Sequence, residues 1–85
     1  MKDILLSADG EIKVYSVPDV IGKNLEKICD DFSSEGGYFD ETDFIDWLNE
    51  YKYPYKKSEF VTNLGLIEDS KDIPEEYKKC KWYNF

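Results

Sequence analysis

The segment from Phe39 to Tyr51, FDETDFIDWLNEY, separates apolar from acidic residues at helical spacing. Its large apolar side chains recur at i, i+3, i+4 and i+7, the spacing of one helix face; they are Phe44, Trp47, Leu48 and Tyr51. Asp40 is a favourable N-cap, because its carboxylate can accept the free N–H groups of the first turn. The pattern predicts an amphipathic helix, with Trp47 at the centre of the core.

The opposite side of this predicted helix carries only negative charge. Asp43, Asp46 and Glu50 follow one another at i, i+3 and i+7, and no lysine stands at helical spacing to neutralise them. They belong to a longer run of eight acids in 21 residues, without a basic residue between Lys27 and Lys52. A solvated face is the usual meaning of such a run, and a contact surface for a basic partner is the alternative.

The upstream sequence predicts a hairpin and a helix. Asp3–Ser7 and Glu11–Val17 have strand character, with Gly10 in the turn free to adopt positive φ. In the second strand, Ile12 and Val14 alternate with water-facing residues, as in a hairpin covered on one side. The water-facing residues are Glu11, Lys13 and Tyr15. Pro18 suits the first helical position, and an apolar stripe follows it. The stripe consists of Ile21, Leu25, Ile28 and Phe32, and Gly22 within it suggests close packing.

After Pro54 ends the acidic helix, a third strand is expected at Glu59–Leu66, with Gly65 at a bulge or bend. Simple alternation would place Phe60 and Thr62 on one face of this strand. A short helix should begin near Pro74, and the aromatic end KWYNF should pack down. The prediction is a single α+β domain over residues 1–85. It has a three-stranded antiparallel sheet, two amphipathic helices on one face in the order ββααβ, and a short C-terminal helical turn. The predicted core comprises Ile12, Val14, Ile21, Leu25, Ile28, Phe32, Phe44, Trp47, Leu48 and Phe60.

Four stretches carry a resemblance: SADGEIKVYSVPDVI, DETDFIDWLNEYKYP, VTNLG and IPEEYKKCKWYNF. Together they resemble an uncharacterised group of small acidic proteins from clostridial and related low-GC bacteria. Those proteins have a longer segment where this chain has SSEGG. The resemblance implies a cytosolic setting in a bacterium or mobile element, and it implies no activity.

Composition restricts the classes of partner. The 85 residues carry 19 acids and 11 basic residues, a formal net charge of −8, and every basic residue is lysine. This balance argues against direct binding of nucleic acid or of an anionic membrane, and it permits a basic protein partner. The short apolar run at Ile4–Leu6 is no signal peptide, so a cytosolic protein is expected. Cys29 and Cys80 are then expected to be free thiols, and two cysteines without histidine cannot close a zinc site.

Calcium binding is one alternative function. The sequence from Asp31 to Thr42 resembles a calcium-binding helix–loop–helix, with oxygen-bearing residues and Gly36 at the sixth position. Its twelfth position, however, is Thr42 in place of the required glutamate. Shifting the register to end on Asp43 puts Phe32 at the first position. The motif is therefore degenerate, and an ordinary capped loop is the simpler interpretation.

The segment YKYPYKK, from Tyr51 to Lys57, interleaves tyrosines with lysines, as single-strand nucleic-acid surfaces do. On a chain of this net charge, a connector covering the sheet edge is the favoured interpretation. No nucleophile elbow, phosphate loop or CxxC motif is present, so no enzyme, metal or cofactor is predicted.

The preferred hypothesis is a small protein–protein interaction module. It is similar in class to anti-CRISPR and other DNA-mimic inhibitors, and it would present an acidic face to a basic nucleic-acid-binding protein. An accessory protein without mimicry is a further alternative. The candidate partner-binding residues are Asp30, Asp31, Glu35, Asp40, Asp43, Asp46 and Glu50.

Overall fold

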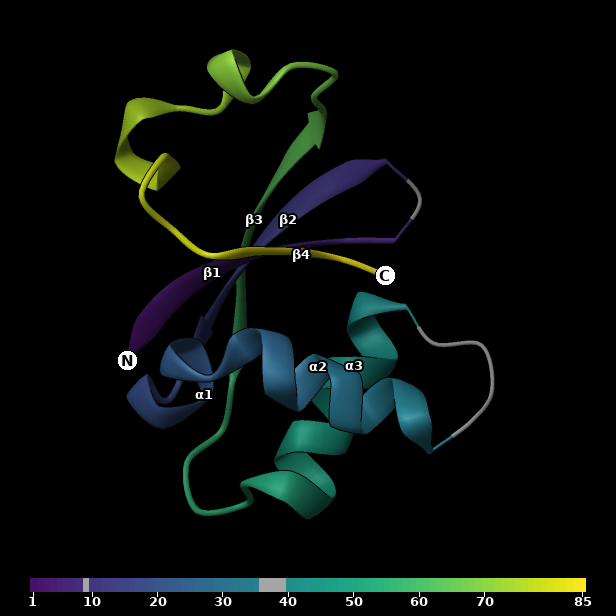
Figure 1. The fold of residues 1–85 in the computed structure, drawn as a ribbon. Coiled ribbons are helices and arrows are strands. Elements are labelled where there is room, and N and C mark those ends of the chain that lie inside the picture. The colour runs from purple at the N-terminus through teal and green to yellow at the C-terminus, as the bar shows by residue number, and fades with distance from the viewer. Residues whose placement is uncertain (9, 36–39) are drawn as a thin grey trace.

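The computed structural model describes residues 1–8, 10–35 and 40–85. It is an α+β fold with a four-stranded mixed sheet in the order β3-β2-β1-β4 (Figure 1). The strands are β1 Lys2–Ser7, β2 Glu11–Val17, β3 Glu59–Leu66 and β4 Trp82–Asn84. The α-helices are α1 Asp19–Lys23, α2 Leu25–Ser34 and α3 Glu41–Trp47. The π-helical turn η1 Leu48–Lys52 continues α3, and the 3-10 turns η2 Ser70–Asp72 and η3 Glu75–Tyr77 precede β4.

The sheet has one more strand than the three predicted. β1 pairs antiparallel with β2 and parallel with β4, so the sheet is mixed instead of purely antiparallel. β4 has only three residues, too few to give an alternating pattern in the sequence. Phe85 packs down as expected, since its ring lies 5.3 Å from that of Phe44, whereas Trp82 of the same segment is 44% exposed.

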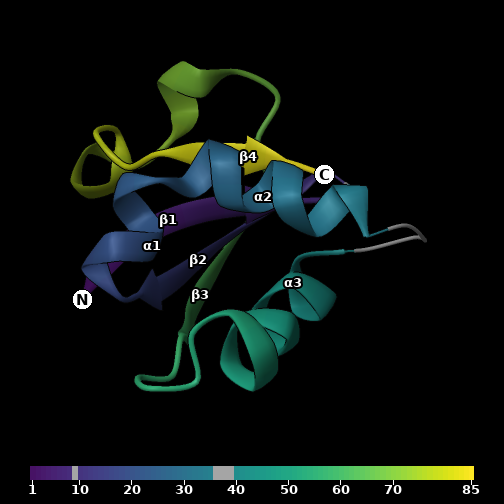
Figure 2. The same cartoon turned by 60° about the horizontal axis from the view of Figure 1, so that its bottom comes forward.

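Both faces of the two central strands are covered (Figures 1 and 2). Ile4 and Leu6 of β1 pack under the three α-helices, as predicted for the helices, in a core that also contains Tyr15. Leu5 faces the other way and packs with Ile73 of the C-terminal segment. The expectation that one face of β2 meets water is therefore wrong. Tyr15, placed on that face, is only 5% exposed.

The predicted first helix is two helices. It breaks at Asn24, whose φ of −115° and ψ of 30° are not helical and whose Nδ2 donates to Val20 O at 3.0 Å. Gly22 lies against the side chain of Lys2, where an added Cβ would stand 3.0 Å from Lys2 Cδ. This confirms the close packing expected at Gly22. The stripe predicted from Ile21 to Phe32 is buried across the break.

The buried stripe of α3 shares Phe44 and Leu48 with the predicted one but begins three residues earlier, with Glu41 and Ile45 in place of Trp47 and Tyr51. It consists of Glu41, Phe44, Ile45 and Leu48. After Trp47 the chain enters the wider π turn, in which Tyr53 N donates to Leu48 O at 2.8 Å. An i→i+5 turn rotates the following side chains away from the face set by the α-helix. Tyr51, predicted to be buried, is consequently 75% exposed.

Trp47 lies at the rim of the core and not at its centre. Its ring packs against Phe32 and Phe44, while its Nε1 donates to Glu35 Oε2 at 2.9 Å on the exposed side. The centre is Phe44, which has no exposed surface. Asp40 is the N-cap of α3, as predicted, because its Oδ1 accepts the N–H of Asp43 at 2.9 Å.

β3 is an edge strand with two bulges. Its register against β2 shifts twice, which leaves Val61 and Leu64 as extra residues. As a result Phe60 pairs with Tyr15 while Thr62 pairs with Val14, so Phe60 and Thr62 lie on opposite faces. The predicted alternation is wrong here, and Phe60 is 56% exposed instead of being core. Gly65 has φ +79°, which confirms the irregularity expected at this glycine.

Candidate functional site: an acidic helix face

Three exposed carboxylates form one face of α3 and η1, which we call the acidic helix face: Asp43, Asp46 and Glu50. Their exposure agrees with the prediction that they point to water. Over the described ranges 1–8, 10–35 and 40–85, ion pairs engage Asp19, Asp31, Glu41 and Glu75, and none engages this face. The acidic helix face therefore carries charge of one sign and takes part in no ion pair among the described residues.

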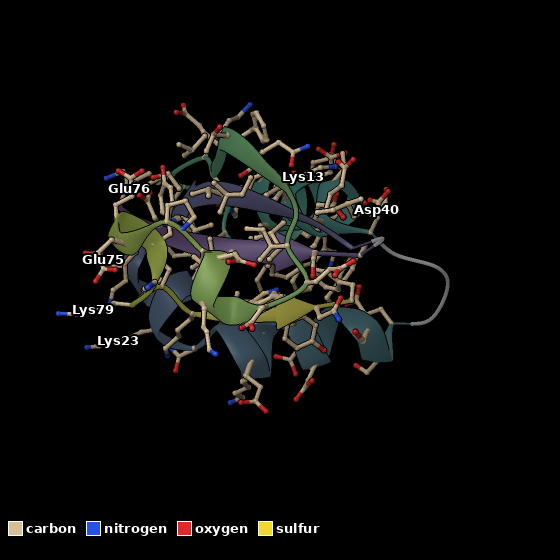
Figure 3. The ribbon with its side chains drawn as sticks, turned by 90° about the horizontal axis from the view of Figure 1, so that it is seen from above. Lys13, Lys23, Asp40, Glu75, Glu76 and Lys79 are labelled. Carbon is tan, nitrogen blue, oxygen red and sulfur yellow. The ribbon has the colours of Figure 1, made fainter. Side chains whose placement is uncertain are left out.

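Glu41, also in the acidic run, points the other way. It is 3% exposed, and its Oε1 contacts the ammonium of Lys13 in β2. Its Oε2 is buried without a hydrogen-bond partner in the described part of the chain. In Figure 3 Lys13 and Asp40 lie toward the same end of the molecule, away from Glu75, Glu76 and Lys79. Glu41 thus anchors α3 on the sheet and does not belong to the surface.

A hollow beside the acidic helix face connects it to the sheet edge. Its lining residues come from α3, β2 and β3: Thr42, Ile45, Asp46, Lys13, Tyr15 and Phe60. The Phe60 ring meets Tyr15 edge-on, with centroids 5.6 Å apart. Burial raises the pKa of the Tyr15 phenol above its ordinary value, and the nearby Glu41 carboxylate acts in the same direction. The polar groups that line the hollow are the Asp46 carboxylate, the Lys13 ammonium and the hydroxyls of Thr42 and Tyr15, beside the exposed Phe60 ring.

The candidate acids on α2 do not join this face. Asp31 lies 3.8 Å from the Lys52 ammonium, and Glu35 accepts the Trp47 indole N–H, so both lie at the junction of α2 and α3. Asp30 is on another side of α2, where it accepts the Tyr83 hydroxyl at 3.4 Å. Asp40 is the N-cap of α3, and its Oδ1 is engaged by the Asp43 N–H. Of the seven predicted residues, only Asp43, Asp46 and Glu50 form a continuous exposed row.

A second hollow lies between α2 and β4. Its polar lining mixes signs: Lys23, Lys27 and Lys81 with Glu26 and Asp30. Lys81 already donates to Lys23 O at 2.6 Å. This hollow could not be predicted from the sequence, because it depends on β4, whose three residues carry no alternating pattern. Its mixed charges select no chemical class of ligand.

The structure also bears on metal and thiol chemistry. In the described ranges no group of three or more histidine, cysteine or carboxylate residues is placed to hold a metal ion. The degenerate calcium loop, Asp31 to Thr42, includes residues 36–39, which lie outside the described residues. Cys29 and Cys80 are both free, as predicted. Burial, followed by the Asp30 charge, raises the pKa of the Cys29 thiol to about 12.

No protein-family model, curated protein or solved structure matches the chain. The resemblance to small clostridial proteins stays a prediction. Among the described residues, no helix has both the length and the apolar character needed to cross a bilayer.

Proposed function

We propose that this chain is a small interaction module whose acidic helix face binds a basic protein. The observation that carries the proposal is the row of three exposed carboxylates with no ion pair among the described residues. Like charges on one helix face repel one another, so a partner of opposite charge relieves that repulsion. A surface of one sign also accelerates association with an oppositely charged partner.

The partner we propose is a protein that itself binds nucleic acid, and the module acts as an inhibitor of the kind encoded by phages and mobile elements. Asp43 and Asp46 are three residues apart, which is about 4.5 Å along an α-helix. Phosphates on one DNA strand step by about 3.4 Å along the axis. The two spacings differ by about 1 Å, but both rows carry one negative charge every few ångströms. We propose that a groove lined with basic residues to receive phosphates receives this row of carboxylates, whereas nucleic acid itself is repelled by a chain of charge −8.

The proposal is tested by capture from the DNA-binding protein fraction of a low-GC bacterial lysate. The bait is the parent protein, and the test variant is Asp43→Asn/Asp46→Asn/Glu50→Gln. Glu26→Gln/Glu75→Gln/Glu76→Gln is the matched control, because it removes the same charge from exposed acids elsewhere. The parent and the control should retain the same basic protein, and the test variant should lose it.

Competition with duplex DNA separates mimicry from general charge attraction. If the acidic helix face occupies a nucleic-acid groove, DNA that fills the groove should release the captured protein. Equal capture by the test variant and the parent would contradict the role of the acidic helix face. Capture that survives saturating DNA would contradict the groove as the contact site.

A further inference from the structure

The outer edge of β3 is the longest exposed strand edge in the described structure. β3 has eight residues and lies at one end of the sheet order, so its other side has no strand beside it. Three apolar residues on this strand are exposed: Phe60 at 56%, Val61 at 44% and Leu66 at 74%. Exposed edge strands are sites of strand addition unless charges, prolines, bulges or a covering element block them. β3 has no proline, and its two bulges determine which of its side chains share a face. Glu59, the first residue of β3, is the only charged residue in the strand.

The two bulges give β3 an internal symmetry on its helix-facing side. The residues there are those paired with Tyr15, Lys13 and Glu11, namely Phe60, Asn63 and Leu66. Phe60 and Leu66 each stand three residues from Asn63. The contact between Asn63 Nδ2 and Glu11 Oε2, at 2.9 Å, confirms that Asn63 is on this side. On its helix-facing side the strand therefore presents an apolar, a polar and an apolar residue, with Asn63 in the middle.

From this pattern we infer that β3 is a self-association surface that pairs antiparallel with β3 of a second copy. A two-fold axis at Asn63, perpendicular to the sheet, places Phe60 of each copy opposite Leu66 of the other. Such an axis keeps each face of the sheet on its own side. The exposed Phe60 and Leu66 then cover one another twice across a single seam.

The charges that flank β3 favour the same arrangement. Lys56 and Lys57 precede the strand, Glu68 and Asp69 follow it, and all four are exposed. Antiparallel pairing brings the basic end of each strand beside the acidic end of the other, whereas parallel pairing sets like charges together. The surface is thus complementary to itself in one orientation only, which identifies a second copy as the occupant.

The start of the strand is held in place for this contact. Asn49 of η1 donates from Nδ2 to Ser58 O at 3.2 Å and accepts the Ser58 N–H on Oδ1 at 2.7 Å. Its side chain therefore satisfies both backbone groups at the residue before β3 and fixes the direction in which the strand leaves.

In the dimer the sheet has eight strands, and both α3 helices lie on one side of it. The inference does not depend on the proposed partner.

Sedimentation velocity on the full chain tests the inference. The monomer has a mass of 10.0 kDa, so a dimer has twice that mass, about 20 kDa. The parent should sediment as a dimer at high micromolar concentration. Phe60→Lys/Leu66→Lys should weaken the dimer by at least tenfold. A parent that stays monomeric at about 1 mM would overturn the inference.

Charge reversal provides a test that loss of folding cannot imitate. Lys56→Glu/Lys57→Glu and Glu68→Lys/Asp69→Lys should each be monomeric, because each dimer would then set like charges together. An equimolar mixture of the two variants should form a heterodimer, since opposite charges then face one another at both ends of the seam. Lys78→Glu/Lys79→Glu changes the net charge as the first variant does and should remain dimeric. A mixture that stays monomeric, or reversal variants that dimerise as well as the parent, would overturn the inference.

Discussion

Lys13 of β2 and Glu41 of α3 form an ion pair between the sheet and the helix, with Glu41 3% exposed and Lys13 24% exposed. Removing one member of a buried pair leaves the other charge without compensation. Lys13→Met should therefore lower the free energy of unfolding by about 3 kcal/mol, measured by urea denaturation. The double variant Lys13→Met/Glu41→Leu should recover most of that loss. A Lys13→Met loss below about 0.5 kcal/mol would mean that the pair acts like an ordinary surface contact.

Phe44 and Trp47 should differ in their contribution to stability. Phe44 has no exposed surface, and Phe44→Ala should cost about 3–5 kcal/mol. Trp47 is only partly buried, so Trp47→Ala should cost about 1–2 kcal/mol, less than a central core position. Equilibrium unfolding of both variants gives the comparison. If Trp47→Ala lowers the free energy of unfolding more than Phe44→Ala does, Trp47 and not Phe44 is the central residue of the core.

Asp40 should stabilise the fold by capping the N-terminus of α3 and not by its negative charge. Asp40→Ala removes the acceptor for the Asp43 N–H and should lower the free energy of unfolding by about 1 kcal/mol. Asp40→Asn removes the charge and keeps the acceptor, so its thermal unfolding should stay close to that of the parent. Equal destabilisation by the two substitutions would show that charge is the dominant contribution.

Cys29 should make the fold sensitive to alkali. Its folded pKa is about 12 and its unfolded value is near 9.0, so above pH 9 the unfolded chain loses a proton that the folded chain keeps. Above pH 9, the Cys29 thiol should therefore lower the free energy of unfolding by about 1.4 kcal/mol for each pH unit. Below pH 9, Cys29 should not change the pH dependence of stability. Urea titrations from pH 8 to 10.5 should show a shallower fall for Cys29→Ala. An unchanged slope would contradict this assignment.

The strands and helices with strong local patterns could be predicted from the sequence. Which of their side chains are buried could not always be predicted. β2 and β3 match their expected ranges, and Asp40 caps its helix. The burial of Tyr15 could not be foreseen, because it depends on α3 packing over a strand that reads as half-exposed. The exposure of Tyr51 arises from the π turn, which the spacing of apolar residues does not reveal.

Part of the candidate site was also predictable. The α3 acids are exposed as expected, because a helix with one apolar face directs the other to water. Glu41 lies in the same acidic run, yet it is buried, since a partner on a distant strand is available to it. Asp31 and Glu35 are drawn to Lys52 and Trp47 by the packing of α2 against α3, which a list of charges cannot show.

The role of the acidic helix face is tested most directly by the association rate of the captured partner as a function of ionic strength. For the parent and for Glu26→Gln/Glu75→Gln/Glu76→Gln, the rate constant should fall steeply as salt rises, because the face steers the encounter. For Asp43→Asn/Asp46→Asn/Glu50→Gln, it should be more than tenfold lower at low salt and nearly independent of salt. Identical rates and identical salt dependence for all three proteins would contradict the account and leave the acidic helix face as solvated surface only.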